Sequence, residues 1–176
     1  MNKYAFILGS HPLISFLEIL NIFEVEKIPN GPHQRVGEVL IIPLKASDAK
    51  LKKLQNALGG TIKIIEIVDE YKGTIFQLDK LLTREHLLKN YFAQKKSKIN
   101  FGFSVYSPKS LVYAEVNWLR NFAYQTKRRL KKDHSIRYVD EKNFDLSSVM
   151  VANNKLVENG AEIVIIKQEN NFMIVP

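Results

Sequence analysis

The sequence predicts an α+β fold in two parts. Short apolar runs with the length of strands alternate with stretches whose apolar residues recur every three or four positions, as in amphipathic helices. The order of these elements differs before and after a polar, basic stretch at residues 94–98. The 176 residues, of which 45% are hydrophobic and 25% charged, suffice for one ordinary globular domain or two small ones.

The first two expected elements are a strand and a helix. Residues 4–8 (YAFIL) form an aromatic and β-branched run that is typical of a buried strand. Residues 12–24 predict a helix, and its apolar stripe consists of Leu13, Phe16, Leu17, Leu20 and Phe23. Ser10 is placed to cap this helix and Pro12 to occupy its first turn. A serine nucleophile on a sharp turn needs small neighbours, as in GxSxG, and the His11-Pro12 pair excludes that motif.

Four further elements complete the first part. A short strand is expected at 25–28 and a longer one at 36–44, with the turn sequence Pro-Asn-Gly-Pro between them. Ser47 is placed to cap a second helix, which the glycine pair 59–60 ends, and residues 61–68 (TIKIIEIV) return as a strand. The order β-α-β-β-α-β is that of the ferredoxin-like unit, a four-stranded antiparallel sheet with two helices on one face.

A connecting helix and a second α/β part follow. Residues 74–93 predict the connecting helix, broken near Thr83, which is placed to cap a second helix. The second part then contains a strand, a long helix, a strand, a helix and two strands joined by a hairpin, at 100–107, about 109–132, 135–139, 146–158, 161–167 and 172–175. The predicted domains are a ferredoxin-like domain at 1–72, a linker helix with a basic linker at 73–98, and a second domain at 99–176.

The positive charge of the chain is concentrated in one segment. The net charge is +8, and residues 94–142 alone hold 12 Lys and Arg against 4 Asp and Glu. A concentrated positive patch attracts polyanions, chiefly nucleic acid or an anionic membrane. No run of about 18 apolar residues exists, so no membrane span is expected. For the positive patch itself we rank nucleic acid first, a plain solvated face second and a membrane surface last, and expect no membrane partner. The absence of cysteine excludes disulfides, thiolate zinc sites and cysteine nucleophiles, and is consistent with a cytoplasmic location.

No residue pattern indicates a catalytic, metal or cofactor site. The four histidines are scattered, and none has a second His, Asp or Glu at the spacing of a metal ligand. Glycine-rich phosphate loops of the GxGxxG and GxxxxGK[ST] types are absent. The glycine pair 59–60 ends a predicted helix instead of opening one, so it is expected to present carbonyl groups, which repel phosphate.

The basic segment predicts an RNA-binding surface. On the long helix, one stripe recurs at steps of three and four, and it consists of Tyr113, Asn117, Arg120, Tyr124, Lys127 and Lys131. Arg128 borders the stripe, and the remaining candidates flank the helix in the sequence: Lys95, Lys96, Lys98 and Arg137. Lysine and arginine contact phosphates, while tyrosine stacks on unpaired bases. The alternative is a solvated helix face whose charges give solubility.

Two stretches resemble one known family. YAFILGSHPLISFLEI (residues 4–19) and LGGTIKIIEIV (residues 58–68) are similar to the N-terminal region of THUMP-containing tRNA guanosine N2-methyltransferases, which modify position ten of tRNA. The element order in the second half resembles a THUMP domain. The resemblance implies that a ferredoxin-like domain and a THUMP domain grip tRNA, that THUMP recognises the 3′ acceptor end, and that a C-terminal Rossmann-like domain binds S-adenosylmethionine and transfers the methyl group.

This chain lacks the sequence motifs of the methyltransferase domain. Neither a glycine loop nor N/D-P-P-Y/F is present. The chain also stops directly after an apolar strand, which leads us to expect a larger parent protein with a C-terminal methyltransferase domain. We therefore expect a tRNA-binding region without catalytic residues. Two alternatives remain: the THUMP region of another tRNA-modifying enzyme (a thiouridine synthase, a pseudouridine synthase or a deaminase), or a non-catalytic protein-interaction module whose basic face meets an acidic partner.

Overall fold

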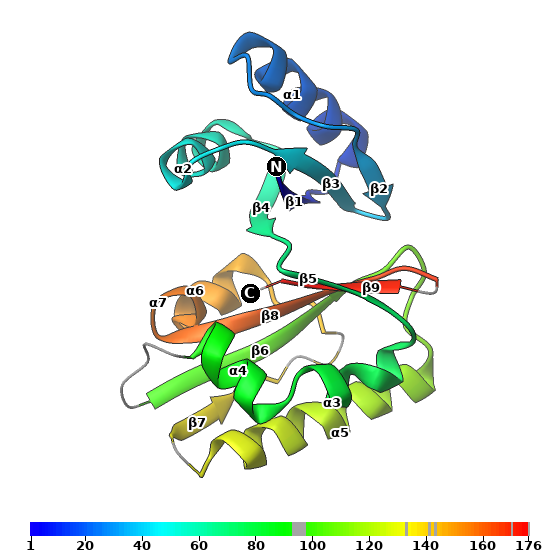
Figure 1. The fold of residues 1–176 in the computed structure, drawn as a ribbon, viewed down its shortest axis with the longest axis vertical. Coiled ribbons are helices and arrows are strands. Elements are labelled where there is room, and N and C mark those ends of the chain that lie inside the picture. Colours follow the sequence, from blue (N-terminus) through cyan, green and yellow to red (C-terminus); the bar gives the residue numbers. More distant parts are fainter. Residues whose placement is uncertain (93–97, 133, 141, 143, 170, 176) are drawn as a thin grey trace. The chain divides into compact units, whose positions relative to one another are not determined.

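The computed structural model describes the whole chain except residues 93–97, 133, 141, 143, 170 and 176 (Figure 1). It separates into two compact units, an N-terminal unit formed by residues 1–69 and a C-terminal unit formed mainly by residues 70–174. Among the described residues, no helix combines the length and the apolar character needed to cross a membrane.

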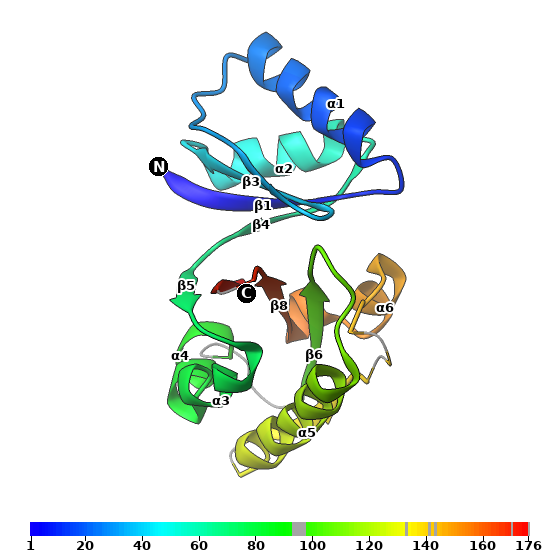
Figure 2. The same ribbon diagram turned by 90° about the vertical axis from the view of Figure 1, so that its right-hand side faces the viewer.

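The N-terminal unit is a four-stranded sheet with two helices on one face (Figure 2). Its elements are β1 (Asn2–Leu8), α1 (Pro12–Val25), β2 (Gln34–Val36), β3 (Val39–Leu44), α2 (Asp48–Ala57) and β4 (Thr61–Glu66). The strand order is β2-β3-β1-β4, and each neighbouring pair is antiparallel. This topology confirms the ferredoxin-like unit predicted from the sequence. Ser47 caps α2 as predicted, because its hydroxyl accepts a hydrogen bond from the Lys50 N–H.

One predicted strand of this unit is wrong and another is right only in part. Residues 25–28 form no strand, since Val25 ends α1 and Ile28 packs in the core. The strand expected at 36–44 is present as β3, but Val36 belongs to β2, which pairs with β3 in a hairpin. The turn between them needs Gly37, which has a φ of 59°, a conformation that glycine adopts without steric cost.

The start and the buried side of α1 also differ from the prediction. Pro12 occupies the first turn as predicted, but His11 is the N-cap residue and no side chain caps the helix, so the role predicted for Ser10 is wrong. The predicted apolar stripe is wrong in part, because Leu13 and Leu17 are exposed while α1 buries a stripe of Ser15, Ile19 and Phe23. The sequence pattern counted serine as polar, but the Ser15 hydroxyl donates to the His11 carbonyl and is satisfied while buried.

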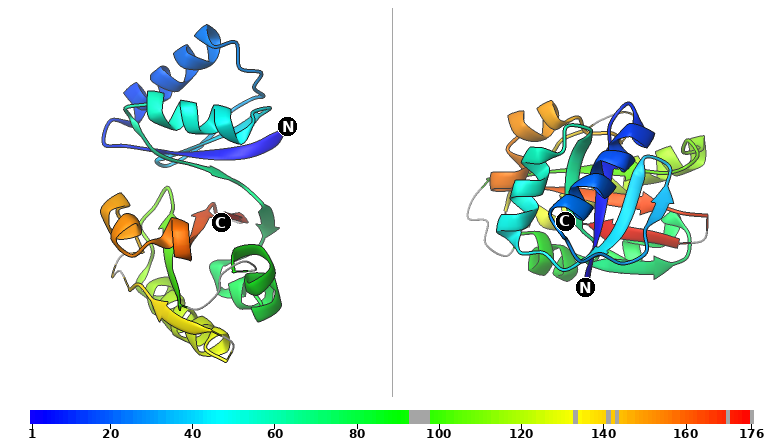
Figure 3. Two further views of the ribbon diagram at one scale, coloured as in Figure 1. Left: turned by 90° about the vertical axis from the view of Figure 1, so that its left-hand side faces the viewer. Right: turned by 90° about the horizontal axis from the view of Figure 1, so that it is seen from above.

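The C-terminal unit is a five-stranded sheet with helices on both faces. Its elements are β5 (Asp69–Lys72), η1 (Ile75–Gln77), α3 (Leu78–Leu81), α4 (Arg84–Tyr91), β6 (Lys98–Tyr106), α5 (Tyr113–Leu130), β7 (Ser135–Tyr138), α6 (Ser148–Asn153), α7 (Leu156–Asn159), β8 (Gly160–Lys167) and β9 (Asn171–Val175). The strand order is β5-β9-β8-β6-β7, and β6 is parallel to both β7 and β8. Helices α3, α4 and α5 share one core with the sheet. Helices α6 and α7 lie on the opposite side of the sheet from α3 and α4 (Figure 3).

The expected elements of the second half are present with different limits. Thr83 caps α4 as predicted, because its hydroxyl accepts a hydrogen bond from the His86 N–H at 3.2 Å. The stretch expected to be a linker helix contributes η1, α3 and α4, whose apolar side chains pack in the core of this unit. The helix predicted at 146–158 is divided into α6 and α7, and Lys155 between them has a φ of 51°.

Candidate nucleic-acid interface

Helix α5 carries most of the predicted RNA-binding residues, and its inner side fixes its orientation. The side chains that it buries are Glu115, Leu119, Phe122, Ala123, Thr126 and Leu130. Glu115 Oε1 forms an ion pair with Lys167 Nζ at 2.6 Å, and Glu115 Oε2 accepts a hydrogen bond from the Val112 N–H at 3.1 Å. The Trp118 ring stacks on Phe122 with ring centroids 5.2 Å apart. These contacts determine which side chains of α5 face solvent.

The predicted stripe lies on the solvent side of α5. Tyr113 is 81% exposed, whereas Asn117 and Arg120 are half-buried. Towards the C-terminal end of the helix, Lys127 is half-buried and Lys131 is exposed. The structure therefore brings these predicted residues together along one helix.

A cluster of cations gathers where α5 ends. We call it the basic cluster, and it consists of Lys127, Arg128, Arg129, Lys131 and Lys132. The prediction omitted Arg129 and Lys132, although their position in the sequence run pointed to them. No described acidic side chain forms an ion pair with any member of the basic cluster. Because the carbonyl groups at a helix C-terminus attract cations, each charge in the last turn can also add about 0.3–1 kcal/mol to helix stability.

Tyr124 is held against the protein by an acidic residue that the prediction missed. Its hydroxyl donates a hydrogen bond to Asp140 Oδ2 at 3.0 Å, and its ring meets the Tyr138 ring edge-on at 5.7 Å. The hydrogen bond with Asp140, followed by the charge of that carboxylate, raises the pKa of Tyr124. Burial, followed by the same charge, raises the pKa of Tyr138. Tyr124 thus has a hydrogen-bond partner within the protein and is 44% exposed, whereas Tyr113 is 81% exposed.

The described candidates Lys98 and Arg137 do not join this surface. Arg137 pairs in register with Asn100, whose side-chain amide donates to the Asn154 carbonyl on the α6 side of the sheet. Their neighbours Phe101 and Tyr138 point into the core shared with α5. Since alternate residues of a strand face opposite sides, Arg137 and likewise Lys98 belong to the sheet face away from α5. Lys95 and Lys96 lie outside the described residues.

The other candidate features considered in the sequence are the histidines and the glycine pair 59–60. Within the residues that the structure describes, no three His, Asp or Glu side chains lie together in a group that could hold a metal ion. In the glycine pair 59–60 the Gly60 carbonyl accepts a hydrogen bond from the Gly9 N–H at 2.8 Å, and both N–H groups of the pair donate to the Glu18 carboxylate at 2.9 Å. These amides are therefore occupied, and this pair does not fit the glycine cradle that S-adenosylmethionine would need.

Comparison with known proteins establishes the fold of this chain and not its family. No family model matches the chain, and no curated protein matches it. PH1313 from Pyrococcus horikoshii Ot3 has a TM-score of 0.54 to this chain at 14% identity, and the match covers 99% of this chain and 53% of PH1313. The likeness shows the fold. It confirms the predicted fold class, a ferredoxin-like unit followed by a THUMP-like α/β unit.

Two more distant structures also cover 99% of the chain. One is a possible methylase from Clostridium difficile 630, with a TM-score of 0.48, 9% identity and 40% of its own chain covered. The other is a 4-thiouridine synthetase in complex with RNA and bound ATP, with a TM-score of 0.44, 14% identity and 40% of its own chain covered. Both TM-scores are below 0.5, so neither structure supports a conclusion about this chain. The chain spans about half of PH1313 and less of the other two.

Proposed function

We propose that this chain is the tRNA-binding region of a tRNA-modifying enzyme and that α5 is its RNA-binding surface. The basic cluster carries this proposal, because its cations have no ion-pair partner among the described acidic residues. The THUMP-like fold supports it, since the fold class agrees with the family that the sequence resembles.

The physical basis of binding is neutralisation of phosphate charge. Each lysine or arginine that meets a phosphate releases counterions, so the affinity falls as salt concentration rises. Tyr113, which is 81% exposed, can stack on an unpaired base without leaving a packed position. Tyr124 would first have to give up its hydrogen bond to Asp140. We therefore assign phosphate contacts to the basic cluster and base stacking to Tyr113.

The parent activity that we propose is S-adenosylmethionine-dependent methylation of a tRNA guanosine at N2. The sequence resemblance at residues 4–19 and 58–68 supports this choice over a thiouridine synthase, a pseudouridine synthase or a deaminase. In this proposal the chain recognises the 3′ acceptor end and positions the tRNA. A methyltransferase domain of the parent protein binds the cofactor and carries out the chemistry.

The experiment that tests RNA binding compares two triple variants of equal charge. Arg120, Lys127 and Lys131 are replaced by alanine in the first, and the control replaces three exposed lysines of other elements of the same unit, Lys72, Lys80 and Lys89. In a gel-shift titration the first variant should bind tRNA about tenfold more weakly, and the slope of log affinity against log salt should fall by about 2–3. The control should bind almost like the wild type. Unchanged binding by the first variant, or equal losses in both, refutes the assignment to α5.

A second titration tests recognition of the acceptor end. A tRNA that lacks its 3′ CCA should bind more weakly than the intact tRNA if the acceptor end is read. Equal affinity for both would contradict acceptor-end recognition while leaving RNA binding by α5 in place. Affinity for neither RNA would favour the protein-interaction module.

A further inference from the structure

Asp140 places an exposed carboxylate beside the stripe of α5. It follows β7, where Tyr138 packs in the core shared with α5 and the next residue, Val139, packs in the core of α6 and α7. Because alternate residues of an extended chain face opposite sides, Asp140 lies on the α5 side with Tyr138. The hydrogen bond from the Tyr124 hydroxyl to Asp140 Oδ2, at 3.0 Å, agrees with this placement. The surface proposed for RNA therefore borders a carboxylate as well as cations.

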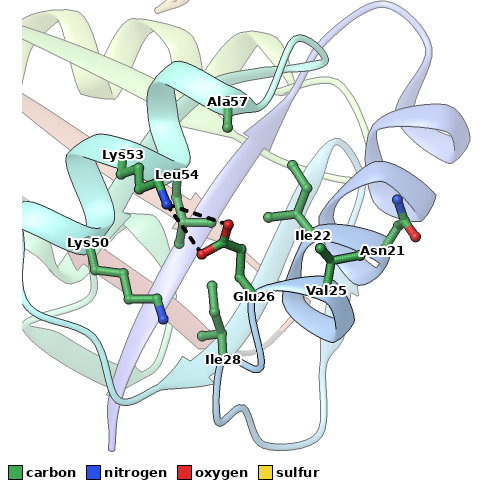
Figure 4. Close-up of a pocket in the computed structure, with 9 residues that line it drawn as sticks. All are labelled: Asn21, Ile22, Val25, Glu26, Ile28, Lys50, Lys53, Leu54 and Ala57. Carbon is green, nitrogen blue, oxygen red and sulfur yellow. Dashed lines mark hydrogen bonds and ion pairs between the residues drawn. The ribbon is translucent and has the colours of Figure 1, made fainter.

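The protein does not neutralise this carboxylate. No described lysine, arginine or histidine forms an ion pair with Asp140. Glu26 in the N-terminal unit is the contrasting case, because both of its oxygens lie 3.4 Å from Lys53 Nζ, beside an apolar depression between α1 and α2 (Figure 4). The bond from Tyr124 uses only Oδ2, and the buried Tyr138 hydroxyl forms no hydrogen bond of normal geometry. Asp140 thus keeps a negative charge and free acceptor positions for a ligand.

The charges around Asp140 determine which part of an RNA strand can lie there. Arg120 is about one turn before Tyr124 on α5, and Lys127 is about one turn after it. These cations attract phosphates, whereas the carboxylate repels them. A strand whose phosphates lie on the cations therefore meets Asp140 with groups that donate hydrogen bonds. The 2′-hydroxyl and the N–H groups of the bases are such donors, and only the N–H groups differ from one nucleotide to the next.

We propose that Asp140 accepts hydrogen bonds from the N1–H and N2–H groups of an unpaired guanine, and that Tyr124 is a positioning residue that holds the carboxylate for this contact. Guanine presents two adjacent donors on its Watson–Crick edge, which match the two oxygens of a carboxylate. Adenine, cytosine and uracil each present one donor group there, next to an acceptor that the carboxylate repels. The proposal rests on the proposed function, because it requires RNA on α5, and it adds a preference among bases.

Four single-stranded RNAs test this preference on the full chain. Each has 12 nucleotides, in repeats of UUG, UUI, UUA or UUC, where I is inosine, which keeps N1–H but lacks the N2 amino group. In fluorescence-anisotropy titrations in lithium buffer, which prevents four-stranded guanine structures, the UUG strand should bind about fivefold more tightly than the UUA and UUC strands. The UUI strand should bind with intermediate affinity, because it offers one of the two donors.

Three variants assign the preference to this carboxylate. Asp140→Asn still accepts the Tyr124 hydrogen bond, but its amino group opposes the donors of guanine, so the preference should fall below about twofold. Asp145→Asn removes the same charge at another exposed position of this unit, and this matched control should keep the preference. Tyr124→Phe keeps the ring and loses the hydroxyl that holds Asp140, so the preference should fall at least about twofold while the salt dependence of binding stays unchanged.

The outcomes separate this proposal from RNA binding itself. Equal affinity for all four strands, a preference for another base, or a guanine preference that survives Asp140→Asn overturns the proposal and leaves RNA binding by α5 in place; Asp140 then only anchors Tyr124. An equal loss of preference in Asp145→Asn assigns the effect to net charge and also overturns it. Binding of tRNA but of none of the four strands overturns this proposal alone. Binding of neither tRNA nor the strands overturns the proposed function and this proposal together.

Discussion

Gly160 is a position where a single added methyl group should be costly. It begins β8 directly after α7 and pairs in register with Asn100 of β6. A Cβ atom here would overlap the Asn100 carbonyl oxygen and would lie 3.0 Å from the Asn100 carbonyl carbon and 3.1 Å from the Leu156 Cα atom. All three are backbone atoms, so no side-chain rotation relieves the overlap, and a strand or α7 must shift.

The expected loss follows from two opposing terms. Overpacking a close contact costs about 1–3 kcal/mol. Replacing glycine by alanine recovers about 0.4–1 kcal/mol, because the unfolded chain loses conformational freedom. Since the overlap is with backbone, we place the cost near the upper end of its range. Gly160→Ala should therefore lower the free energy of unfolding by about 2 kcal/mol.

The single tryptophan makes this loss measurable in the unit concerned. Trp118 stacks on Phe122 in the C-terminal unit, so its fluorescence during urea denaturation reports the unfolding of that unit. Gly102→Ala is the control, because its added Cβ atom would lie 2.5 Å from Leu146 Cδ1, the end of a side chain that can rotate. The control should lose less than Gly160→Ala. A Gly160→Ala variant as stable as the wild type, or a larger loss in the control, refutes the backbone-overlap argument.

Three further substitutions should have measurable effects on stability. The pKa of Tyr138 is raised by folding, so as the pH rises the unfolded chain loses this proton before the folded chain does. The contribution of Tyr138 to the free energy of unfolding is therefore full below about pH 10 and falls above it. In urea denaturation between pH 10 and 11.5, Tyr138→Phe should make the decline of this free energy with pH less steep, by up to about 1.4 kcal/mol per pH unit. Glu115→Ala should lower the free energy of unfolding by about 2–3 kcal/mol, measured by tryptophan fluorescence, because it leaves the mostly buried Lys167 without its ion-pair partner. A Lys167→Met variant that loses more stability than Glu115→Ala would contradict this reason. Glu18→Ala should cost about 1–2 kcal/mol in circular-dichroism melts, because it frees the two N–H groups of the glycine pair 59–60, and an unchanged melt would contradict this.

The topology of the N-terminal unit was predictable because its signals are local. Apolar runs mark β1 and β4, and the hydroxyl of Ser47 marks the start of α2. The β2–β3 hairpin was missed because its turn interrupts an apolar run by only two residues, and the positive φ of Gly37 leaves no trace in the hydrophobic pattern. The buried side of α1 was missed because Ser15 is satisfied by a carbonyl of its own chain. The pattern of apolar residues in the sequence depends on neither the backbone conformation of Gly37 nor the hydrogen bond of Ser15, so it could predict neither.

The candidate surface was predictable to the extent that it lies on one helix. The 3.6-residue period of α5 is enough to align Tyr113 with Lys127 and Lys131. Asp140 was missed because its contact with Tyr124 joins a helix to the residue that follows a strand, and no periodicity connects them. The position of Arg137 could have been predicted, since it alternates with two apolar residues of β7 and must face away from them. The prediction that Arg137 belongs to the RNA-binding surface of α5 did not take this alternation into account.

Like charges of the basic cluster repel one another on the helix surface. Lys127 and Lys131 are four residues apart, and Arg128 and Lys131 are three apart, so like charges are neighbours on the helix surface. Such pairs typically cost about 0.2–0.5 kcal/mol each. The attraction of cations to the helix C-terminus, about 0.3–1 kcal/mol for each charge in the last turn, offsets this repulsion. If the basic cluster binds RNA as proposed, the phosphates would also relieve this repulsion, so the repulsion between Lys127 and Lys131 should be smaller in the complex than in the free chain.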